Sequence, residues 1–284
     1  MNTLTKKIDF AVIFSVKNAN PNGDPLNGNR PRTDYDNLGE VSDVCIKRKI
    51  RDRLQESGQT IFVQSDEKKT DGCPSLRARA ESEEHGLGKE VFNVKEGDYF
   101  AQAAIIDHAC NKWFDIRAFG QIFAYKGSKK GQGVSIPIRG AVSIHSAFSI
   151  EPISITSTQI TKSTSGEGDG SKKASDTMGM KHRVDKGIYV FYGSMNPQLA
   201  ERTGYSNEDA LVIKGILPKL FENDASSARP EGSMRVLKAF WWEHNCKSGQ
   251  YSSAKVHNSL TVKINGSYEL TNLDNLTPEE IDGF

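Results

Sequence analysis

Apolar residues occupy every second position near the start of the chain, at Ile8, Phe10, Val12, Phe14 and Val16. A period of two places these side chains on one face of an extended segment, so the pattern predicts a β-strand over 8–16. The strand leads into residues 17–32, which are dense in Asn, Gly and Pro. A connection of this length and composition is irregular, and long connections in compact domains are often functional.

The next apolar pattern has a helical period, because Ile46, Ile50 and Leu54 recur four residues apart. Ser42 is a suitable N-cap for this segment, and Asp43 lies in the first turn, where a negative charge is favourable. We therefore predict a helix that begins after Ser42 and ends near Leu54, with one apolar face turned toward the core.

Later segments alternate between helix and strand signals. We predict an irregular polar insertion over 55–97, a helical region over about 99–123, strands over 133–153, 188–192 and 234–244, a helix capped at 206–209, and a hairpin centred on 265–266. Within 133–153 the larger apolar residues Val142, Ile144, Phe148 and Ile150 alternate with small or polar ones. The stretch 156–186, rich in Ser, Thr, Gly and Lys, has the least core-like composition.

This order of elements predicts an α+β fold with helices on one face of an antiparallel sheet. The simplest version is an RRM-like, ferredoxin-like core with two large insertions. The chain of 284 residues is long enough for one elaborated domain with a proper core.

The balance of charge excludes a protein that simply coats DNA, since 37 Lys and Arg face 36 Asp and Glu, a formal net charge of +1. A local basic face remains compatible with nucleic acid. The four cysteines form no CxxC pair, the first ten residues do not resemble a secretory signal, and no apolar run approaches a membrane span. We therefore expect a reduced cytoplasmic protein without a membrane segment.

The predicted first helix carries Lys47, Arg48 and Arg51 together on a face next to its apolar stripe. Cations close to a capped helix start can form a track for phosphates, aided by backbone N–H groups and the helix dipole. The alternative is a solvated charged face, partly neutralised by Asp43 and Asp52. Two more cations in the preceding loop, Arg30 and Arg32, favour nucleic acid.

The polar stretch 156–186 offers a second candidate. It combines two methionines with nearby cations: Lys172, Lys173, Met178, Met180, Lys181, His182 and Arg183. Apolar wedges flanked by cations unstack bases while the cations hold the phosphate backbone. The alternative is a disordered polar loop in which the methionines are incidental.

Signals for catalysis and for metals are weak. Asp34, Asp36 and Asp115 are the carboxylates placed near basic segments, but no His accompanies them in sequence. The pairs His108/Cys110 and His244/Cys246 lack the Cys-pair spacing that structural zinc sites prefer. We expect no catalytic residue, no metal and no cofactor.

Four segments together resemble the backbone subunit of type I-C CRISPR Cascade, in the RAMP superfamily. They are Asn18–Asp34, with Asn-Ala-Asn-Pro-Asn-Gly-Asp-Pro and Arg-Pro-Arg-Thr-Asp, and Val41–Arg48, Asp115–Gly120 and Ile136–Val142. The matches extend from Phe10 to about Trp242, and the long Asn-Pro-Asn-Gly-Asp-Pro match is the specific one.

The resemblance implies a hand-like protein with an RRM-like palm, a helical or irregular finger insertion and a thumb β-hairpin insertion. By position, the palm would comprise 1–54, 98–155 and 187–284, the finger 55–97 and the thumb 156–186. Copies of such a subunit stack head to tail along CRISPR RNA into a helical filament and leave most bases exposed for pairing with target DNA.

The resemblance also implies a set of RNA-binding positions. Carried over by position, they are Asn20, Asn22, Arg30, Arg32, Ser42, Lys47, Arg48, Arg51, Arg139, Lys181, His182 and Arg183, with Met178 or Met180 as the thumb wedge. Val44 stands where some relatives have a Gln, so that polar contact is not expected here.

The partners that follow are CRISPR RNA, target DNA through RNA pairing, further copies of the chain and other Cascade subunits, in antiviral defence in a prokaryotic cytoplasm. Two other functions stay open from the residues. One is a target-RNA-cleaving backbone subunit, as in type III complexes, that uses a loop Asp such as Asp34 or Asp36. The other is a self-assembling scaffold that binds no RNA.

Overall fold

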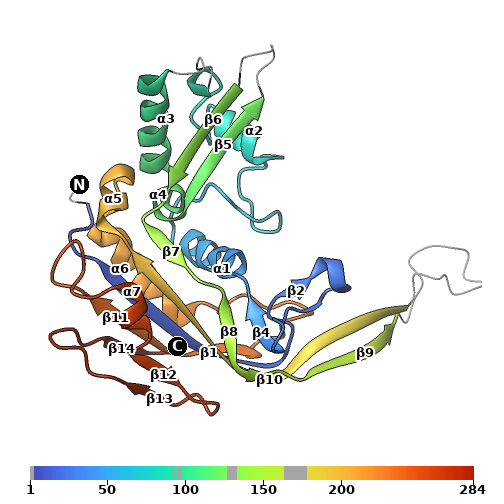
Figure 1. Ribbon diagram of the computed structural model, residues 1–284. Helices are drawn as coiled ribbons and strands as arrows, with labels where there is room; N and C mark the ends of the chain where they lie inside the picture. The colour runs from blue at the N-terminus through green and yellow to red at the C-terminus, as the bar shows by residue number, and fades with distance from the viewer. Residues whose placement is uncertain (1–2, 93, 95–97, 127–132, 163–177) are drawn as a thin grey trace, which may run out of the picture.

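A large antiparallel sheet forms the centre of the computed structural model, which describes residues 3–92, 94, 98–126, 133–162 and 178–284 (Figure 1). Its strands follow the order β14-β11-β1-β10-β8-β4, and β7 and β9 also pair with β10. The bounds are β1 Ile8–Ala19, β4 Leu38–Val41, β7 Val142–Ile144, β8 Ala147–Pro152, β9 Ile155–Thr161, β10 Met178–Met195, β11 Met234–Glu243 and β14 Glu279–Asp282.

Three short ladders and the helices complete the described fold. The ladders are β2 Gly23–Asp24 with β3 Arg30–Pro31, β5 Gly120–Lys126 with β6 Gly133–Arg139, and β12 Leu260–Val262 with β13 Tyr268–Leu270. The helices are α1 Asp43–Glu56, α2 Leu76–Glu81, α3 Tyr99–Lys112, α4 Phe114–Phe119, α5 Pro197–Thr203, α6 Asn207–Ile216 and α7 Ser253–His257, with 3-10 turns η1 Pro25–Asn27, η2 Glu90–Phe92 and η4 Leu217–Lys219. The predicted mixture of helices with an antiparallel sheet is confirmed.

Strand β1 is buried on both faces. Phe10 and Phe14 pack in the main core together with α1 and α6. Ala11 and Ile13 point the other way and pack with Trp242 beneath the segment that carries α7, β12 and β13. The prediction of a strand over 8–16 is confirmed, and the C-terminal segment covers the face that the helices leave free.

Local capping sets the starts of the two helices that cover the main core. Ser42 accepts a hydrogen bond from the Cys45 N–H, and Ile46, Ile50 and Leu54 are buried, as predicted for α1. At α6, Ser206 and Asp209 form a reciprocal capping box. The hairpin at 265–266 is confirmed as well, with Gly266 at φ +84° between β12 and β13.

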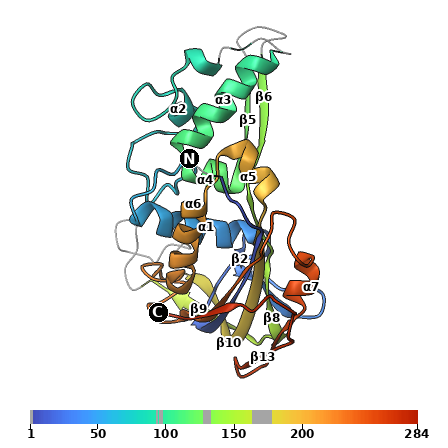
Figure 2. The same ribbon diagram turned by 90° about the vertical axis from the view of Figure 1, so that its left-hand side faces the viewer.

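A second core lies apart from the sheet. Phe62, Trp113 and Phe123 pack together there, and α2, α3 and the β5–β6 ladder form a lobe at one end of the molecule (Figure 2). This core joins Ile105, Phe123 and Ile138 to Phe62 and Phe92, whereas Phe114 and Ala118 of α4 pack in the main core. The predicted boundary between insertion and palm at residue 97 therefore divides one packed unit.

The predicted helical region over 99–123 is too long. Helix α4 ends at Phe119, because Gly120 has φ +80° and starts β5. A Cβ on Gly120 would lie 2.3 Å from the Ile138 carbonyl oxygen, so only glycine fits at this turn. Beyond it, Phe123 faces the second core from a strand.

The predicted alternation over 142–150 changes phase in the middle. Val142 and Ile144 are buried, but in β8 Ala147 and Ser149 are buried while Phe148 is 38% exposed. His145 and Ser146, which connect β7 to β8, shift the alternation of buried and exposed positions by one residue. The expectation that Phe148 lies on the core face is wrong for this reason.

Under the C-terminal segment, Asp9 forms a buried charged network. Its carboxylate lies 2.8 Å from His244 Nε2, 3.5 Å from His257 Nε2 and 3.4 Å from Lys7 Nζ, and Asp9 and His244 are fully buried. Burial by itself raises the pKa of Asp9, but the hydrogen bond with His244 and the nearby His257, Ser253 and Lys7 outweigh burial and hold that pKa well below the ordinary value.

We expect Asp9→Asn to lower the free energy of unfolding at pH 7 by roughly 1.5–3 kcal/mol, the usual effect of a lost charged hydrogen bond. Because the pKa of Asp9 is lowered in the folded state, its contribution is complete above the unfolded pKa of about 3.9 and is lost as the pH falls. Urea unfolding of both proteins at pH 7 and at about pH 3 measures this. An equal gap at both pH values would contradict it.

Candidate nucleic-acid interface

The β2–β3 hairpin is attached to the start of α1. Asn22 Oδ1 accepts hydrogen bonds from the Ser42 N–H at 3.0 Å and from the Ser42 hydroxyl at 2.9 Å. The Ser42 oxygen in turn caps α1. The structure thus brings together Asn22 and Ser42, two predicted RNA-binding residues, at a helix N-terminus where Val44 is 66% exposed.

The same hairpin is attached to the β9–β10 arm, which extends away from the body beyond the end of β1 (Figure 1). Arg30 Nη1 donates to Ser157 Oγ at 2.9 Å, and His182 Nδ1 lies 2.8 Å from the same oxygen. Arg30 and His182 therefore meet through Ser157, a residue that no sequence motif marked as functional. The hairpin bridges the start of α1 and the arm.

The side chains of the arm divide between its two faces. The ladder pairs Met180 with Gln159 and His182 with Ser157, so Met178, Met180 and His182 share one face by strand alternation. The two methionines are 66% and 56% exposed. Lys181 and Arg183 lie on the opposite face, where Arg183 Nε is 3.9 Å from an Asp185 oxygen. Lys172 and Lys173 fall outside the described residues.

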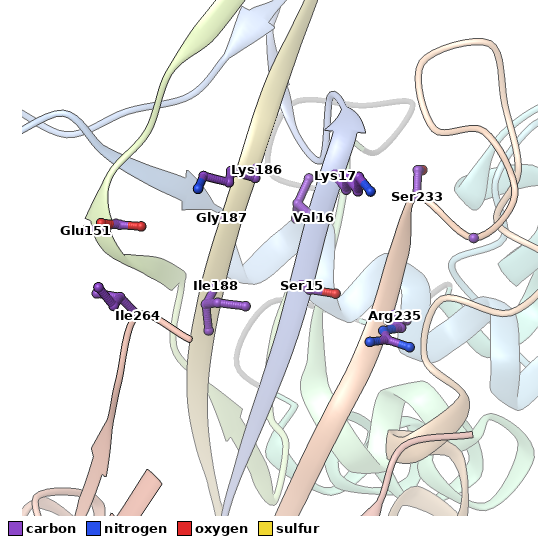
Figure 3. Close-up of a pocket in the computed structure, with 11 residues that line it drawn as sticks. Ser15, Val16, Lys17, Glu151, Lys186, Gly187, Ile188, Ser233, Arg235 and Ile264 are labelled. Atoms are coloured by element: carbon purple, nitrogen blue, oxygen red, sulfur yellow. The ribbon is translucent and has the colours of Figure 1, made fainter. Parts of the chain in front are cut away.

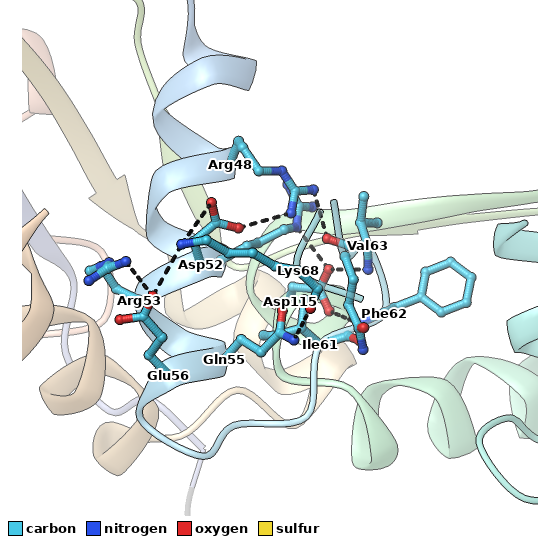
Figure 4. Close-up of polar contacts among 12 residues, drawn as sticks. Arg48, Asp52, Arg53, Gln55, Glu56, Ile61, Phe62, Val63, Lys68 and Asp115 are labelled. Carbon is cyan, nitrogen blue, oxygen red and sulfur yellow. Dashed lines mark hydrogen bonds and ion pairs between the residues drawn. The ribbon is translucent and has the colours of Figure 1, made fainter. Parts of the chain in front are cut away.

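The three cations of α1 have different roles, and Figure 4 shows the contacts of Arg48. Lys47 pairs with Asp43 at 2.9 Å on the helix surface. Arg48 contacts Asp52 at 3.3 Å and donates to the Val63 carbonyl at 2.7 Å. Arg51 pairs with Asp115 and lies over the Phe119 ring. Lys47 is therefore the cation of the predicted phosphate track that contacts only its own helix. Arg48 and Arg51 contact other segments and anchor α1.

Asp115 is a structural residue in this arrangement. It is fully buried and accepts hydrogen bonds from Arg51 Nε at 2.8 Å and from the N–H groups of Phe62 and Val63 at 2.7 and 3.1 Å. All three bonds tie α4 to α1 and to the loop after it. The carboxylate has no exposed oxygen to offer a substrate, which removes it as an acid or base.

The remaining predicted residues lie at other places. Asn20 is buried and donates to the Asn29 carbonyl at 2.7 Å, so it supports the loop from inside. Arg32 is half-buried, 3.4 Å from Asp24. Arg139 lines a separate pocket of about 640 Å³ together with Lys7 and Lys247.

Of the two loop carboxylates considered for RNA cleavage, Asp34 and Asp36, Asp34 has a structural role. Asp34 Oδ1 accepts from the N–H groups of Asp36 and Leu38 at 3.0 and 2.8 Å, which shapes the turn before β4. Between them, Tyr35 is fully exposed, and Leu26 in the β2–β3 connection is 99% exposed. These two side chains were not among the candidates selected from the sequence. The sequence signal for their exposure is that each lies among polar residues.

The His/Cys pairs do not converge. Cys110 is buried, which raises the pKa of its thiol to about 12, whereas His108 is exposed. His244 is buried against Asp9, whereas Cys246 is exposed. Among the residues that the structure describes, no group of three His, Cys, Asp or Glu could hold a metal ion, and no helix is long and apolar enough to cross a membrane.

Hydrogen bonds through the β2–β3 hairpin link the capped start of α1 to the arm with its exposed methionines, and we call these residues the α1–arm surface: Asn22, Arg30, Ser42, Lys47, Met178, Met180 and His182. Cations, hydroxyls and helix N–H groups bind phosphates, and exposed methionines can contact bases. Fold and surface thus define an α+β protein with a candidate polyanion-binding surface.

The chain belongs to the family of CRISPR-associated protein Cas7, whose family model matches residues 6–281. A CRISPR-associated protein Cas7 from Haloferax volcanii is 27% identical over 245 residues, which cover 80% of this chain and 67% of that protein.

Two solved structures are also similar to this chain. A chain of a "CRISPR RNA-guided surveillance complex, pre-nicking" has a TM-score of 0.49 and 17% identity, covering 83% of this chain and 75% of that one. A chain of a "CRISPR RNA-guided surveillance complex" has a TM-score of 0.45 and 16% identity, covering 83% and 68%.

We expect Arg51→Ala to lower the free energy of unfolding by roughly 3–5 kcal/mol, because it leaves Asp115 charged and buried without its cation. The matched change Lys47→Ala should cost less than about 1 kcal/mol, since its ion pair lies on the helix surface. Chemical denaturation of both variants measures the difference. Equal stability of the two variants would show that Arg51 does not anchor the helix.

Proposed function

We propose that this chain is a non-catalytic CRISPR RNA-binding backbone subunit of a type I, I-C-like Cascade surveillance complex. Copies assemble head to tail along the guide RNA, together with other Cascade subunits. The RNA bases stay available to pair with target DNA, in antiviral defence in a prokaryotic cytoplasm.

One observation carries the proposal beyond family membership. The β2–β3 hairpin is hydrogen-bonded to the cap of α1 through Asn22 and to the arm through Arg30. These contacts give an RNA chain a continuous path from a helix N-terminus to the exposed methionines. A pure scaffold has no need of this combination of groups.

The hand-like organisation is part of the proposal. In chain order, β1, α1, β8, β10, α6 and β11 run strand, helix, strand, strand, helix, strand, and their strands lie in the order β11-β1-β10-β8. This is the order of a ferredoxin-like, RRM-like palm. We identify the β9–β10 arm with the thumb predicted over 156–186, and the lobe around Phe62, Trp113 and Phe123 with the finger predicted over 55–97.

Phosphates would bind at the start of α1. The first N–H groups of the 14-residue helix have no intrahelical acceptor, and the helix dipole favours an anion there. Lys47 lies one turn further and is held by Asp43, so binding requires that its ammonium group turn from Asp43 to the phosphate. Contacts of this kind position an RNA without reading its sequence.

The thumb would act on the bases. Met178 and Met180 are exposed on the same face as His182. A methionine pressed between two bases separates them, while the neighbouring His182 and Arg30 hold the adjoining phosphates. One nucleotide would be displaced per copy of the chain, which divides the guide into short segments.

The decisive experiment mixes the purified, nucleic-acid-free protein with RNAs of increasing length and measures the mass of the complexes. We expect oligomers whose size increases with RNA length and whose affinity falls steeply with salt. Oligomers without RNA would favour the scaffold. Cleavage of complementary RNA at regular intervals, abolished by Asp36→Ala, would favour the type III-like nuclease.

We expect Lys47→Ala to weaken RNA binding by a similar factor for unrelated sequences and to reduce the slope of log K against log salt by about 0.7, the value for one phosphate contact to a single strand. The matched control is Lys255→Ala, an exposed lysine on α7. Salt-titrated fluorescence anisotropy measures both. A loss confined to some sequences, or an equal loss in the control, would exclude a phosphate contact at Lys47.

We expect Met178→Ser with Met180→Ser to keep RNA affinity within a few-fold but to abolish base displacement, because apolar wedges separate bases while cations supply affinity. RNAs with 2-aminopurine at successive positions report displacement as increased fluorescence. The wild type should show maxima at regular intervals, and the variant should show none. Maxima that persist in the variant would assign the wedge to another side chain.

A further inference from the structure

On the face of the sheet opposite to α1, an open groove of about 520 Å³ crosses β11, β1 and β10 (Figure 3). Ser15 and Lys17 of β1, Lys186 and Ile188 of β10, and Arg235 of β11 line it. Ile264, from the β12–β13 hairpin, closes one side. None of these residues belongs to the α1–arm surface.

Strand alternation places these side chains on the far face. Val12, Phe14 and Val16 pack in the main core with α1, whereas Ala11 and Ile13 pack under the C-terminal segment. Ser15 continues the second series, and Lys17 follows it before the chain turns at Asn18, which has φ +53°. A ligand in the groove is thus separated from α1 by the thickness of the sheet.

The register of the sheet gathers three cations around Ser15. Lys17 stands directly across from Lys186, and Ser15 lies between Ile188 on one side and Arg235 on the other. Directly opposed side chains in antiparallel strands start about 4.5–5.5 Å apart at Cβ, and diagonal ones about 7–8 Å. Side chains as long as Lys and Arg can therefore reach one anion above Ser15.

This concentration of charge is uncompensated. Lys17, Lys186 and Arg235 are exposed and have no ion-pair partner among the residues that the structure describes. Glu151 is the acidic residue that lines the groove, against three cations. Like charges directly opposed across a sheet are destabilising, so the Lys17–Lys186 pair costs stability unless an anion joins it.

We propose that this groove is a second phosphate-binding site, which holds the backbone of a nucleic-acid strand on the face of the sheet away from α1. The Lys and Arg side chains bind phosphate oxygens, and the Ser15 hydroxyl donates a further hydrogen bond. The proposal does not depend on RNA binding at the α1–arm surface, since the two surfaces share no residue.

The lining favours a polynucleotide over an acidic protein segment. At Ser15, in the centre of the groove, β1 is paired with β10 on one side and β11 on the other, so it offers no free edge for a peptide to pair with by strand addition. A polynucleotide needs only cations and hydroxyls at its phosphates. The lining contains no aromatic ring, and bases therefore find no stacking partner, so binding is insensitive to sequence.

The test compares a groove variant, Lys17→Ser with Lys186→Ser and Arg235→Ser, with a control that removes equal charge elsewhere, Lys219→Ser with Lys255→Ser and Arg202→Ser. All six side chains are exposed, so both variants should fold. The probe is a fluorescein-labelled thymidine oligonucleotide of about 12 nucleotides, within the range of single-strand sites. Anisotropy is measured over a series of salt concentrations.

We expect the groove variant to bind at least about tenfold more weakly, with a salt slope reduced by roughly 2, about 0.7 for each of three contacts. The affinity of the control variant should change less than about twofold. The groove substitutions should cause the same loss of affinity in a Lys47→Ala background, since the free-energy effects of distant sites add. If Lys47→Ala has no effect on RNA binding but the groove variant still binds the oligonucleotide more weakly, the groove is supported independently of the proposed function.

Wild-type affinity in the groove variant would overturn the proposal. Normal oligonucleotide binding with lost binding of polyglutamate would instead assign the groove to an acidic protein segment, which also overturns it. Should the groove variant unfold at a lower urea concentration than the control, Lys17→Arg with Lys186→Arg provides the second measurement. Retained cations must then retain binding of the oligonucleotide, and a loss with these arginines would contradict a phosphate site.

Discussion

Strand β1 positions both layers of the fold. It pairs with β10 on one side and β11 on the other from Ile8 to Val16, and both of its faces are buried. Phe14 stacks on Tyr189 of the neighbouring strand β10 and contacts Phe221 on the main-core side, while Ala11 and Ile13 pack under the C-terminal segment. A substitution in β1 therefore affects two cores at once.

The position of the arm also follows from the pairing of β1 with β10. β10 is one strand of 18 residues, of which Val184–Met195 pairs with β1 in the sheet and Met178–Val184 pairs with β9 in the arm. Tyr189 and Phe191 are buried in the main core, and Met178 and Met180 are exposed near the far end. Side chains on a continuous strand are positioned by the core itself, as the proposed wedge role of the methionines requires.

Charge in this protein divides into cations that hold the fold and cations that remain available. Arg48 and Arg51 join α1 to the second core, with Asp115 at the centre of that junction. Lys47 and, on the other face of the sheet, Lys17 and Lys186 have no such tie to a distant segment. This division explains how a chain with a formal net charge of +1 can offer basic surfaces on both faces.

Local signals in the sequence were sufficient for the alternation of β1, the caps at Ser42 and Ser206, and the turn at Gly266. Motifs in the sequence also indicated the family. Long-range contacts in the folded chain were needed to show that Arg51 is an anchor, that Ser157 joins Arg30 to His182, and that β5 replaces the end of a predicted helix. Caps and periodicity depend on neighbours within one turn or strand. The partner of a charge depends on which distant segments the fold brings into contact, and no local pattern contains that information.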